Sequence, residues 1–412
     1  MKLNKLLLAL AASGIATSAF ATNGYFAHGI GVKAKAMGGA SIAFAEDGFG
    51  AASNPANLAQ VKDGYSVGVS AFAPDRGVVK ASGVAVGGNE AADAFAIPEF
   101  AYNKTLNDKI NWGVVVYGNG GMNVDYGQPV YDGSANTTSN LEQLFIAPTI
   151  SYKVNERNTV AASLNMVYQT FKATGLNAFA PFTRTGNDNP GGHGVDDSMG
   201  VGVKLGWTGK LSDTLTGGAY YQPKTSMDKF SAYKNLFAQD GGFDIPETYG
   251  MGVAIKANPN TTVALDVVQI NYSGIKSLAN INDNMQAGGG ALGAENGLGF
   301  GWKDMTVYKL GVAHQMDANT TVRAGWNYGK QPISASQLDF NLLAPAVVEH
   351  HFTFGMTRAL DKNSDISMHA MYAPNVTLNG VAAGASASDG TGAISKLEMS
   401  QYEIGVQYSK KF

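Results

Sequence analysis

The sequence predicts an all-β fold, a fourteen-stranded antiparallel β-barrel that spans a membrane. Three observations predict it. Short polar turns alternate with long connections rich in Gly, Ser and Asn along most of the chain. The runs between them, of about ten residues, carry apolar side chains on every second position, as strands with one apolar and one polar face do. The chain also closes on such a run, QYEIGVQYSKKF, with an aromatic residue at its last position.

The composition is compatible with a barrel and excludes several other classes of protein. Of the 412 residues, 15% are charged, well below the roughly 25% of soluble domains. The absence of cysteine excludes disulfides and thiolate metal sites. A net charge of −3 gives no case for a nucleic-acid partner, and we expect none.

The first 21 residues have the pattern of a signal peptide. Lys2 and Lys5 form a basic start, the apolar stretch LLLALAASGIA follows, and AFA at 19–21 is an A-x-A-like cleavage site. We expect cleavage after Ala21 and export to the cell outer membrane. A short membrane anchor is the alternative, but the apolar stretch falls short of the ~20 residues that a helix needs to span a bilayer.

Residues 22–63 precede the first expected strand, which lies near Tyr65. They are small, rich in glycine and only weakly periodic, and they include many apolar side chains. Such a composition is too apolar for a solvated tail. We therefore expect a plug inside the lumen, and we expect residues 64–412 to form the barrel with its long extracellular loops.

The connections alternate in length along the chain. Short turns at one end and long loops at the other are what an up-and-down outer-membrane barrel requires, whereas a soluble sandwich gives no reason for this alternation. The short turns fall at 104–110, 153–159, 210–214, 256–261, 316–320 and 360–364. The long connections fall around 74–92, 118–140, 175–197, 228–244, 274–303, 330–346 and 379–395.

The closing strand, residues 401–412, completes the barrel. It must pair with the first strand, because lipid tolerates no open sheet edge. Phe412 behind alternating apolar residues also resembles the signal by which barrels are presented to the outer-membrane assembly machinery. Lys410 departs from that signal, which often has an aromatic residue at this position.

The stretch GGASIAFAEDGFGAASNPANL resembles the hatch of the FadL/TodX family of outer-membrane hydrophobic-compound transporters, and Asn54, Pro55 and Ala56 are its most characteristic part. Residues 301–333, 341–357 and the closing strand are also similar to that family. The resemblance implies a barrel plugged by the hatch, which imports long-chain fatty acids or hydrocarbons. It also implies lateral release through a kinked third strand. We expect a monomer whose partners are a hydrophobic substrate, outer-membrane lipid and the assembly machinery.

Two long loops contain apolar segments, LNAFAPFT (176–183) and FSAYKNLFA (230–238), the second with aromatic side chains at helical spacing. On the same end of the barrel they could form a groove that captures an apolar ligand, and the resemblance implies such a groove too. The alternative is that these side chains only pack the loops on each other. The candidate capture residues are Leu176, Phe179, Phe182, Phe230, Tyr233, Leu236 and Phe237.

Alternation also points five charged side chains towards the lumen. A cation among them could hold a carboxylate head group. The alternative, favoured for any single residue because both signs are present, is a mutual ion-pair network around the hatch. The five are Lys204, Asp266, Lys309, Arg323 and Glu403.

The third strand, NWGVVVYGNGG (111–121), is the candidate for lateral exit. Its lumen face is expected to carry Val115 and Tyr117, next to glycines that permit a bulge or bend. The alternative is a simple strand end entering a glycine-rich loop. The candidate exit residues are Gly113, Val115, Tyr117, Gly118 and Gly120.

Enzymatic function is not expected. His350 and His351 are adjacent on a strand and point to opposite faces, so they cannot easily share a metal. The other histidines are scattered, and no G-x-S-x-G, Walker or H-E-x-x-H motif occurs. No catalytic residue, cofactor or metal is therefore predicted. A membrane-embedded hydrolase, whose site would assemble from distant strands, remains an alternative, as do a general porin for small polar solutes and a structural or adhesive barrel.

Overall fold

The computed structural model is a closed barrel of long antiparallel strands. It describes residues 22–80, 83–87, 94–131, 135–281, 290–380 and 394–412. The expected signal peptide, residues 1–21, lies outside the described residues. None of the described helices is long and apolar enough to cross a membrane.

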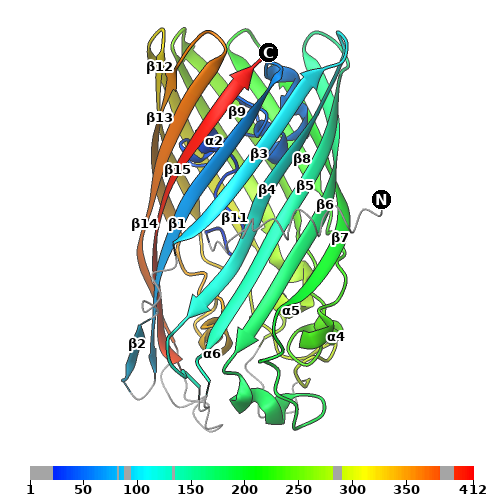
Figure 1. Cartoon of the computed structure of the whole chain (residues 1–412), viewed down its shortest axis with the longest axis vertical. Helices are drawn as coiled ribbons and strands as arrows, with labels where there is room; N and C mark the ends of the chain where they lie inside the picture. The colour runs from blue at the N-terminus through cyan, green and yellow to red at the C-terminus, as the bar shows by residue number, and fades with distance from the viewer. Residues whose placement is uncertain (1–21, 81–82, 88–93, 132–134, 282–289, 381–393) are drawn as a thin grey trace.

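Fourteen strands form the barrel wall, and neighbours in the sequence are neighbours in the wall (Figure 1). The last strand pairs with the first from Gly64 opposite Lys411 to Lys80 opposite Ile394, which closes the sheet. The predicted fourteen-stranded barrel and its closing strand are confirmed. A short additional strand, β2 (Ala85–Gly87), pairs with β1 alone among the described strands. The wall strands are β1 (Gly64–Lys80), β3 (Phe95–Thr105), β4 (Ile110–Asp125), β5 (Thr138–Lys153), β6 (Asn158–Thr174), β7 (Asp196–Lys210), β8 (Leu215–Gln222), β9 (Glu247–Asn258), β10 (Thr261–Asn271), β11 (Met305–Asp317), β12 (Thr320–Gly329), β13 (His350–Ala359), β14 (Ser364–Asn379) and β15 (Ile394–Lys411).

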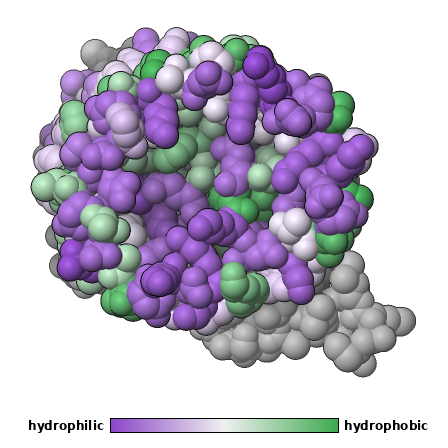
Figure 2. All heavy atoms as spheres, turned by 90° about the horizontal axis from the view of Figure 1, so that it is seen from above, coloured by the Kyte–Doolittle hydropathy of each residue, from purple (hydrophilic) through white to green (hydrophobic). Residues whose placement is uncertain are grey.

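The two ends of the barrel differ as the alternation of connections predicts. Six short turns and the C-terminus lie at the upper end in Figure 1, and the long connections lie at the lower end. Seen from above, the short-turn end is ringed by hydrophilic residues (Figure 2). The long connections contain η2 (Asn177–Phe182), η3 (Ser231–Tyr233), α4 (Ala238–Gly241), η4 (Tyr272–Gly274), α5 (Lys276–Ala279) and α6 (Leu338–Asn341).

The expected extent of some long connections was wrong. β4 continues to Asp125 and β5 begins at Thr138, so about half of the connection expected over 118–140, residues 118–125 and 138–140, is strand. β1 likewise continues to Lys80. Backbone hydrogen bonds build the ladder, and glycine-rich or polar residues can pair without a regular alternation of side chains.

The wall has an apolar outer face and a polar inner face. In β13, Phe352, Phe354 and Met356 are exposed on the outside, whereas Thr353 and Thr357 are buried inside. This is the alternation of a lipid-facing barrel. The polar residues that the inner face buries must find partners within the lumen.

Residues 22–63, here called the N-terminal segment, lie inside the barrel (Figure 1). They contain α2 (Val32–Lys35), α3 (Gly50–Ser53) and η1 (Pro55–Gln60). η1 packs against β5, β6 and β7, and α2 against β13 and β14. The apolar side chains of the segment are therefore removed from water although the barrel interior is polar.

Candidate transport site

Asn54 holds a turn of the N-terminal segment against the barrel wall. Its side-chain oxygen accepts the N–H of Ala56 at 3.1 Å, which caps η1, and Pro55 supplies the fixed φ of the first helical position. Its amide nitrogen donates to the carbonyls of Ile42 at 2.8 Å and Trp207 at 2.9 Å. The same side chain thus joins two parts of the segment to β7.

We expect Asn54→Ala to lower uptake while the barrel still assembles. The change removes all three hydrogen bonds, among them the cap of η1, and loss of such a cap typically costs about 0.5–2 kcal/mol. The wall strands do not depend on these bonds. The measurements are ligand uptake and heat-modifiable gel mobility, and normal uptake with a folded barrel would contradict a functional role for this turn.

The five charged residues predicted on the lumen face all contact the N-terminal segment. Two are acids: one carboxylate oxygen of Asp266 accepts the N–H groups of Ser41 and Ile42 at 2.7 and 3.0 Å, and Glu403 pairs with Lys35 at 2.9 Å. Three are cations that bind a carboxylate or backbone carbonyls of the segment. Arg323 holds Glu46 by two bonds of 2.7 Å, Lys204 donates to the carbonyl of Ala52 at 2.7 Å, and Lys309 donates to that of His28 at 3.0 Å.

The Glu46–Arg323 pair remains charged at neutral pH. Burial raises the pKa of Glu46, but the guanidinium of Arg323 outweighs burial and lowers that pKa below its usual value. The pair therefore stabilises the segment at neutral pH, and its contribution is lost only as the pH falls through the lowered pKa. For Lys35 the net shift is upward. Burial lowers the pKa of its ammonium group, but the carboxylates of Glu403 and Glu99 raise this pKa above its usual value.

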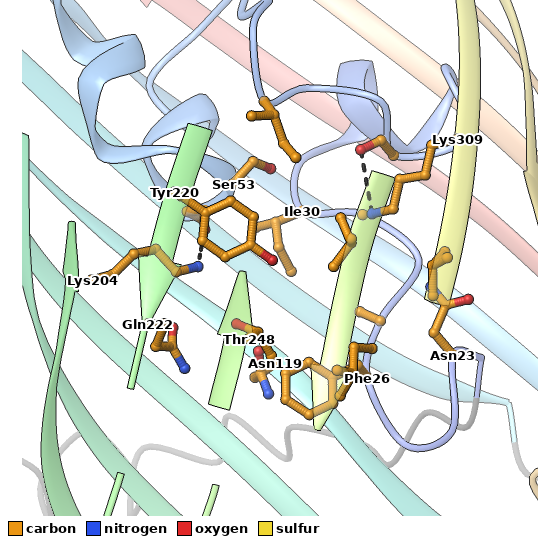
Figure 3. A pocket seen from close by; sticks show the side chains of 18 of the residues that line it. Asn23, Phe26, Ile30, Ser53, Asn119, Lys204, Tyr220, Gln222, Thr248 and Lys309 are labelled. Carbon is orange, nitrogen blue, oxygen red and sulfur yellow. Dashed lines mark hydrogen bonds between the residues drawn. The ribbon is translucent and has the colours of Figure 1, made fainter. Parts of the chain in front are cut away.

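A cavity of about 80 Å³ lies between the N-terminal segment and the wall (Figure 3). Phe26 and Ile30 of the segment and Tyr117 and Asn119 of β4 are among the residues that line it. The ammonium group of Lys204 lies over the ring of Tyr220, 4.8 Å from its centroid, and Lys309 reaches in from β11. The cavity therefore has a mixed apolar and polar lining that includes two lysines.

The ladder between β3 and β4 stops beside this cavity. The two strands pair from Thr105 opposite Asn111 only as far as Phe100 opposite Val116, although both strands continue. Pro98 in β3 has no N–H to donate. In β4, Asn119 is an extra residue, since Gly118 faces Leu144 of β5 and Gly120 already faces Gln143. A bulge of this kind bends the strand.

The N-terminal segment supplies hydrogen bonds to the bulge. The N–H of Ala27 donates to the carbonyl of Asn119 at 2.9 Å, and the N–H of Gly121 donates to that of Tyr25 at 2.9 Å. A side chain at Gly120 would collide with the carbonyl of Tyr25, so glycine permits this close approach. Val115 and Tyr117 lie on the buried inner face just before the bulge. Gly113 also lies on this face, next to Leu58 of η1.

The seven candidate capture residues gather in one apolar core of the long connections. Six are buried, and Phe182 is half-buried at its edge. Phe171 of β6 holds the second segment together, with ring centroids 4.7 Å from both Tyr233 and Phe237. Helical spacing in this segment yields only short turns, with η3 over Ser231–Tyr233 and α4 beginning at Ala238. These side chains pack the loops on each other, and their role in capture stays a prediction.

Several residues of the site were not predicted. Glu46 and Lys35 form ion pairs with charged residues of the wall. Phe26 and Tyr220 line the cavity, and Asn119 forms the bulge. In the sequence, the only signal among them is the run of glycines around Asn119. The others belong to segments far apart in the chain and meet only across the closed lumen.

A closed barrel with an apolar belt and an internal segment bonded to its wall defines an outer-membrane barrel of the transport class. The family described as outer membrane protein transport protein (OMPP1/FadL/TodX) matches residues 8–412. The chain belongs to this family and is an outer-membrane protein.

Solved structures share the fold. The P. putida toluene transporter TodX is 20% identical, with 93% of this chain and 99% of that chain covered and a TM-score of 0.69. A Pseudomonas aeruginosa FadL homologue is 15% identical, with 94% and 100% covered and a TM-score of 0.72. The Ralstonia pickettii toluene transporter TbuX is 18% identical, with 93% and 99% covered and a TM-score of 0.66. Comparison with curated proteins gave no match.

Proposed function

We propose that this protein carries hydrophobic compounds across the outer membrane, with the N-terminal segment as its hatch. One observation carries the proposal: the cavity touches both the hatch and the β4 bulge, beside the point where the β3–β4 ladder ends. A compound in this cavity would pass between β3 and β4 and enter the bilayer. The long connections would capture the compound before it reaches the hatch.

The energetics of an apolar compound favour lateral exit. Returning a chain to water costs about 0.8 kcal/mol per CH₂ group. A hollow of about 190 Å³ at the short-turn end is lined by charged side chains, including Lys33, Asp47 and Lys410. An axial route would pass this polar end and release the compound into water. A route between strands keeps it in contact with apolar surfaces.

Two classes of substrate fit different features of the cavity. The side chains of Lys204 and Lys309 favour a carboxylate head group, since each donates to a backbone carbonyl and a carboxylate makes a stronger hydrogen bond. On this observation, long-chain fatty acids are our first proposal. The small cavity volume and the fold shared with two toluene transporters support monoaromatic hydrocarbons as the second.

Lys204→Met should separate these two classes. A hydrogen bond to a charged group contributes about 1.5–3 kcal/mol, so we expect affinity for dodecanoate to fall about tenfold to a hundredfold. Affinity for toluene should change much less, because toluene has no carboxylate to accept a hydrogen bond from the ammonium group. Binding of both compounds to the purified protein in detergent is the measurement.

The control for this variant is Lys256→Met, which removes an exposed lysine near the turn between β9 and β10. Equal dodecanoate binding by the Lys204 variant, Lys256 variant and original chain would contradict a head-group role. Tight toluene binding without dodecanoate binding would make a monoaromatic the better substrate. Uptake of a labelled sugar in preference to either compound would favour a general porin.

A further inference from the structure

Three side chains from distant parts of the sequence meet on the inner face of the wall. His28 comes from the N-terminal segment, His369 from β14 and Glu403 from β15, and one potential ligand atom of each lies within 4.8 Å of the others. All three side chains are buried, with exposed fractions of 0 or 1%. They do not line the cavity described above.

The potential ligand atoms lie within 4.8 Å of one another, farther apart than the ligands of a tetrahedral metal ion. Nδ1 of His28 lies 3.7 Å from Oε2 of Glu403, and Nε2 of His369 lies 3.4 Å from Oε1 of the same carboxylate. Zinc bonds of about 2.0–2.1 Å in tetrahedral geometry place ligand atoms roughly 3.3–3.4 Å apart. Rotation of the side chains would bring the three groups around one ion.

Polar atoms of this cluster lack hydrogen bonds within the part of the chain that the structure describes. They are Oε2 of Glu403, both ring nitrogens of His369 and Nε2 of His28. Such atoms are unfavourable inside a protein unless another partner satisfies them. A cation bound to Oε2 and to one nitrogen of each ring would supply that partner.

The contacts of Lys35 leave Oε2 of the Glu403 carboxylate available to a cation. Its ammonium group binds Oε1 of Glu403 at 2.9 Å and lies 3.2 Å from Glu99, so it does not take Oε2. Two carboxylates therefore surround one ammonium group. Gly405 adds room, since a Cβ at this position would lie 2.5 Å from Cε1 of His369. The ring of His351 stacks on His28, with centroids 5.9 Å apart and planes 8° apart, which orients the imidazole.

We propose that His28, His369 and Glu403 bind one Zn²⁺ ion that fastens the N-terminal segment to β14 and β15. Two imidazole nitrogens and one carboxylate oxygen are a donor set typical of zinc, whereas Mg²⁺ and Ca²⁺ prefer oxygen alone. One ligand belongs to the segment and two belong to the wall. The ion would therefore resist displacement of the segment.

The test uses the full chain, purified in detergent without a polyhistidine tag and treated with a chelator. Titration with ZnCl₂ should show one equivalent bound, and Co²⁺ in its place should give the visible absorption of a tetrahedral site. His369→Gln is the decisive variant, because it leaves the Glu403–Lys35 pair intact. We expect it, His28→Gln and Glu403→Gln each to weaken Zn²⁺ binding at least a hundredfold.

His314→Gln is the matched control, since this histidine is exposed on β11 and bonded to Thr261. It should bind Zn²⁺ as the original chain does. A second measurement follows protease cleavage within the N-terminal segment, which Zn²⁺ should slow in the original chain but not in His28→Gln. Failure of the original chain to bind one equivalent, or equal binding by His369→Gln, would overturn the site. Zn²⁺ binding that survives His28→Gln would overturn the fastening of the segment.

Discussion

Deletion of Asn119 will abolish uptake of hydrophobic compounds while the barrel remains folded. Asn119 is the extra residue of the β4 bulge, so its removal places Gly118 and Gly120 opposite Leu144 and Gln143 without a break in register. A straight β4 would continue along β3 and narrow the gap between them. The deletion also removes the carbonyl that accepts the N–H of Ala27. Both effects act on the proposed exit.

Uptake of a labelled hydrophobic compound by cells that produce the variant is the measurement, with heat-modifiable mobility as the assay of folding. The control deletes Asn375: Pro374 and Asn375 of β14 together lie opposite only Ser400 of β15, so this deletion also removes one extra residue, away from the cavity. It should retain uptake. If the variant without Asn119 transports normally as a folded barrel, exit between β3 and β4 is excluded and an axial route becomes the better proposal.

Replacing Phe230 and Phe237 together by Ser will remove capture of a long-chain ligand. Both rings are buried and contact Phe171, and truncation of one buried Phe costs about 3–5 kcal/mol. The loop core around β6 should therefore loosen, and any capture surface that it supports should be lost. Ligand affinity in detergent measures capture, and limited proteolysis of residues 228–244 measures the loop core.

Phe182→Ser distinguishes capture from packing. This ring is half-buried at the edge of the same core, so its loss should leave the loops resistant to protease. A direct role in capture predicts weaker ligand binding by this variant too. Unchanged affinity in Phe182→Ser, together with loss only in the loosened double variant, would assign these aromatic residues to loop packing.

The sequence by itself determined the class of fold. Alternation in segments such as 351–357 depends on neighbouring residues alone, and so do the polar turns. Both are therefore readable without tertiary structure. The number of wall strands, the pairing of the last strand with the first and the inward direction of Arg323 and Glu403 follow from this local pattern. Strand ends were less predictable, because pairing beyond the membrane depends on the neighbouring strand rather than on alternation.

Glycines around Asn119 indicated a bend in the third strand, but only the tertiary structure decided what lies against it. Ala27 and Tyr25 reach the bulge because the N-terminal segment folds back into the lumen. The sequence did not indicate the partners of the charged wall residues for the same reason: Glu46 and Arg323 are separated by 277 positions in the chain.

The cluster of His28, His369 and Glu403 shows most clearly that contacts across the lumen depend on the tertiary structure. His28, His369 and Glu403 follow no spacing that a metal motif would have, and the sequence therefore predicted no site. Closure of the sheet places β14 and β15 side by side, and the internal segment brings His28 to them. Local patterns determine which face a side chain occupies, whereas contacts across a lumen depend on closure of the whole barrel and on the path of the chain inside it.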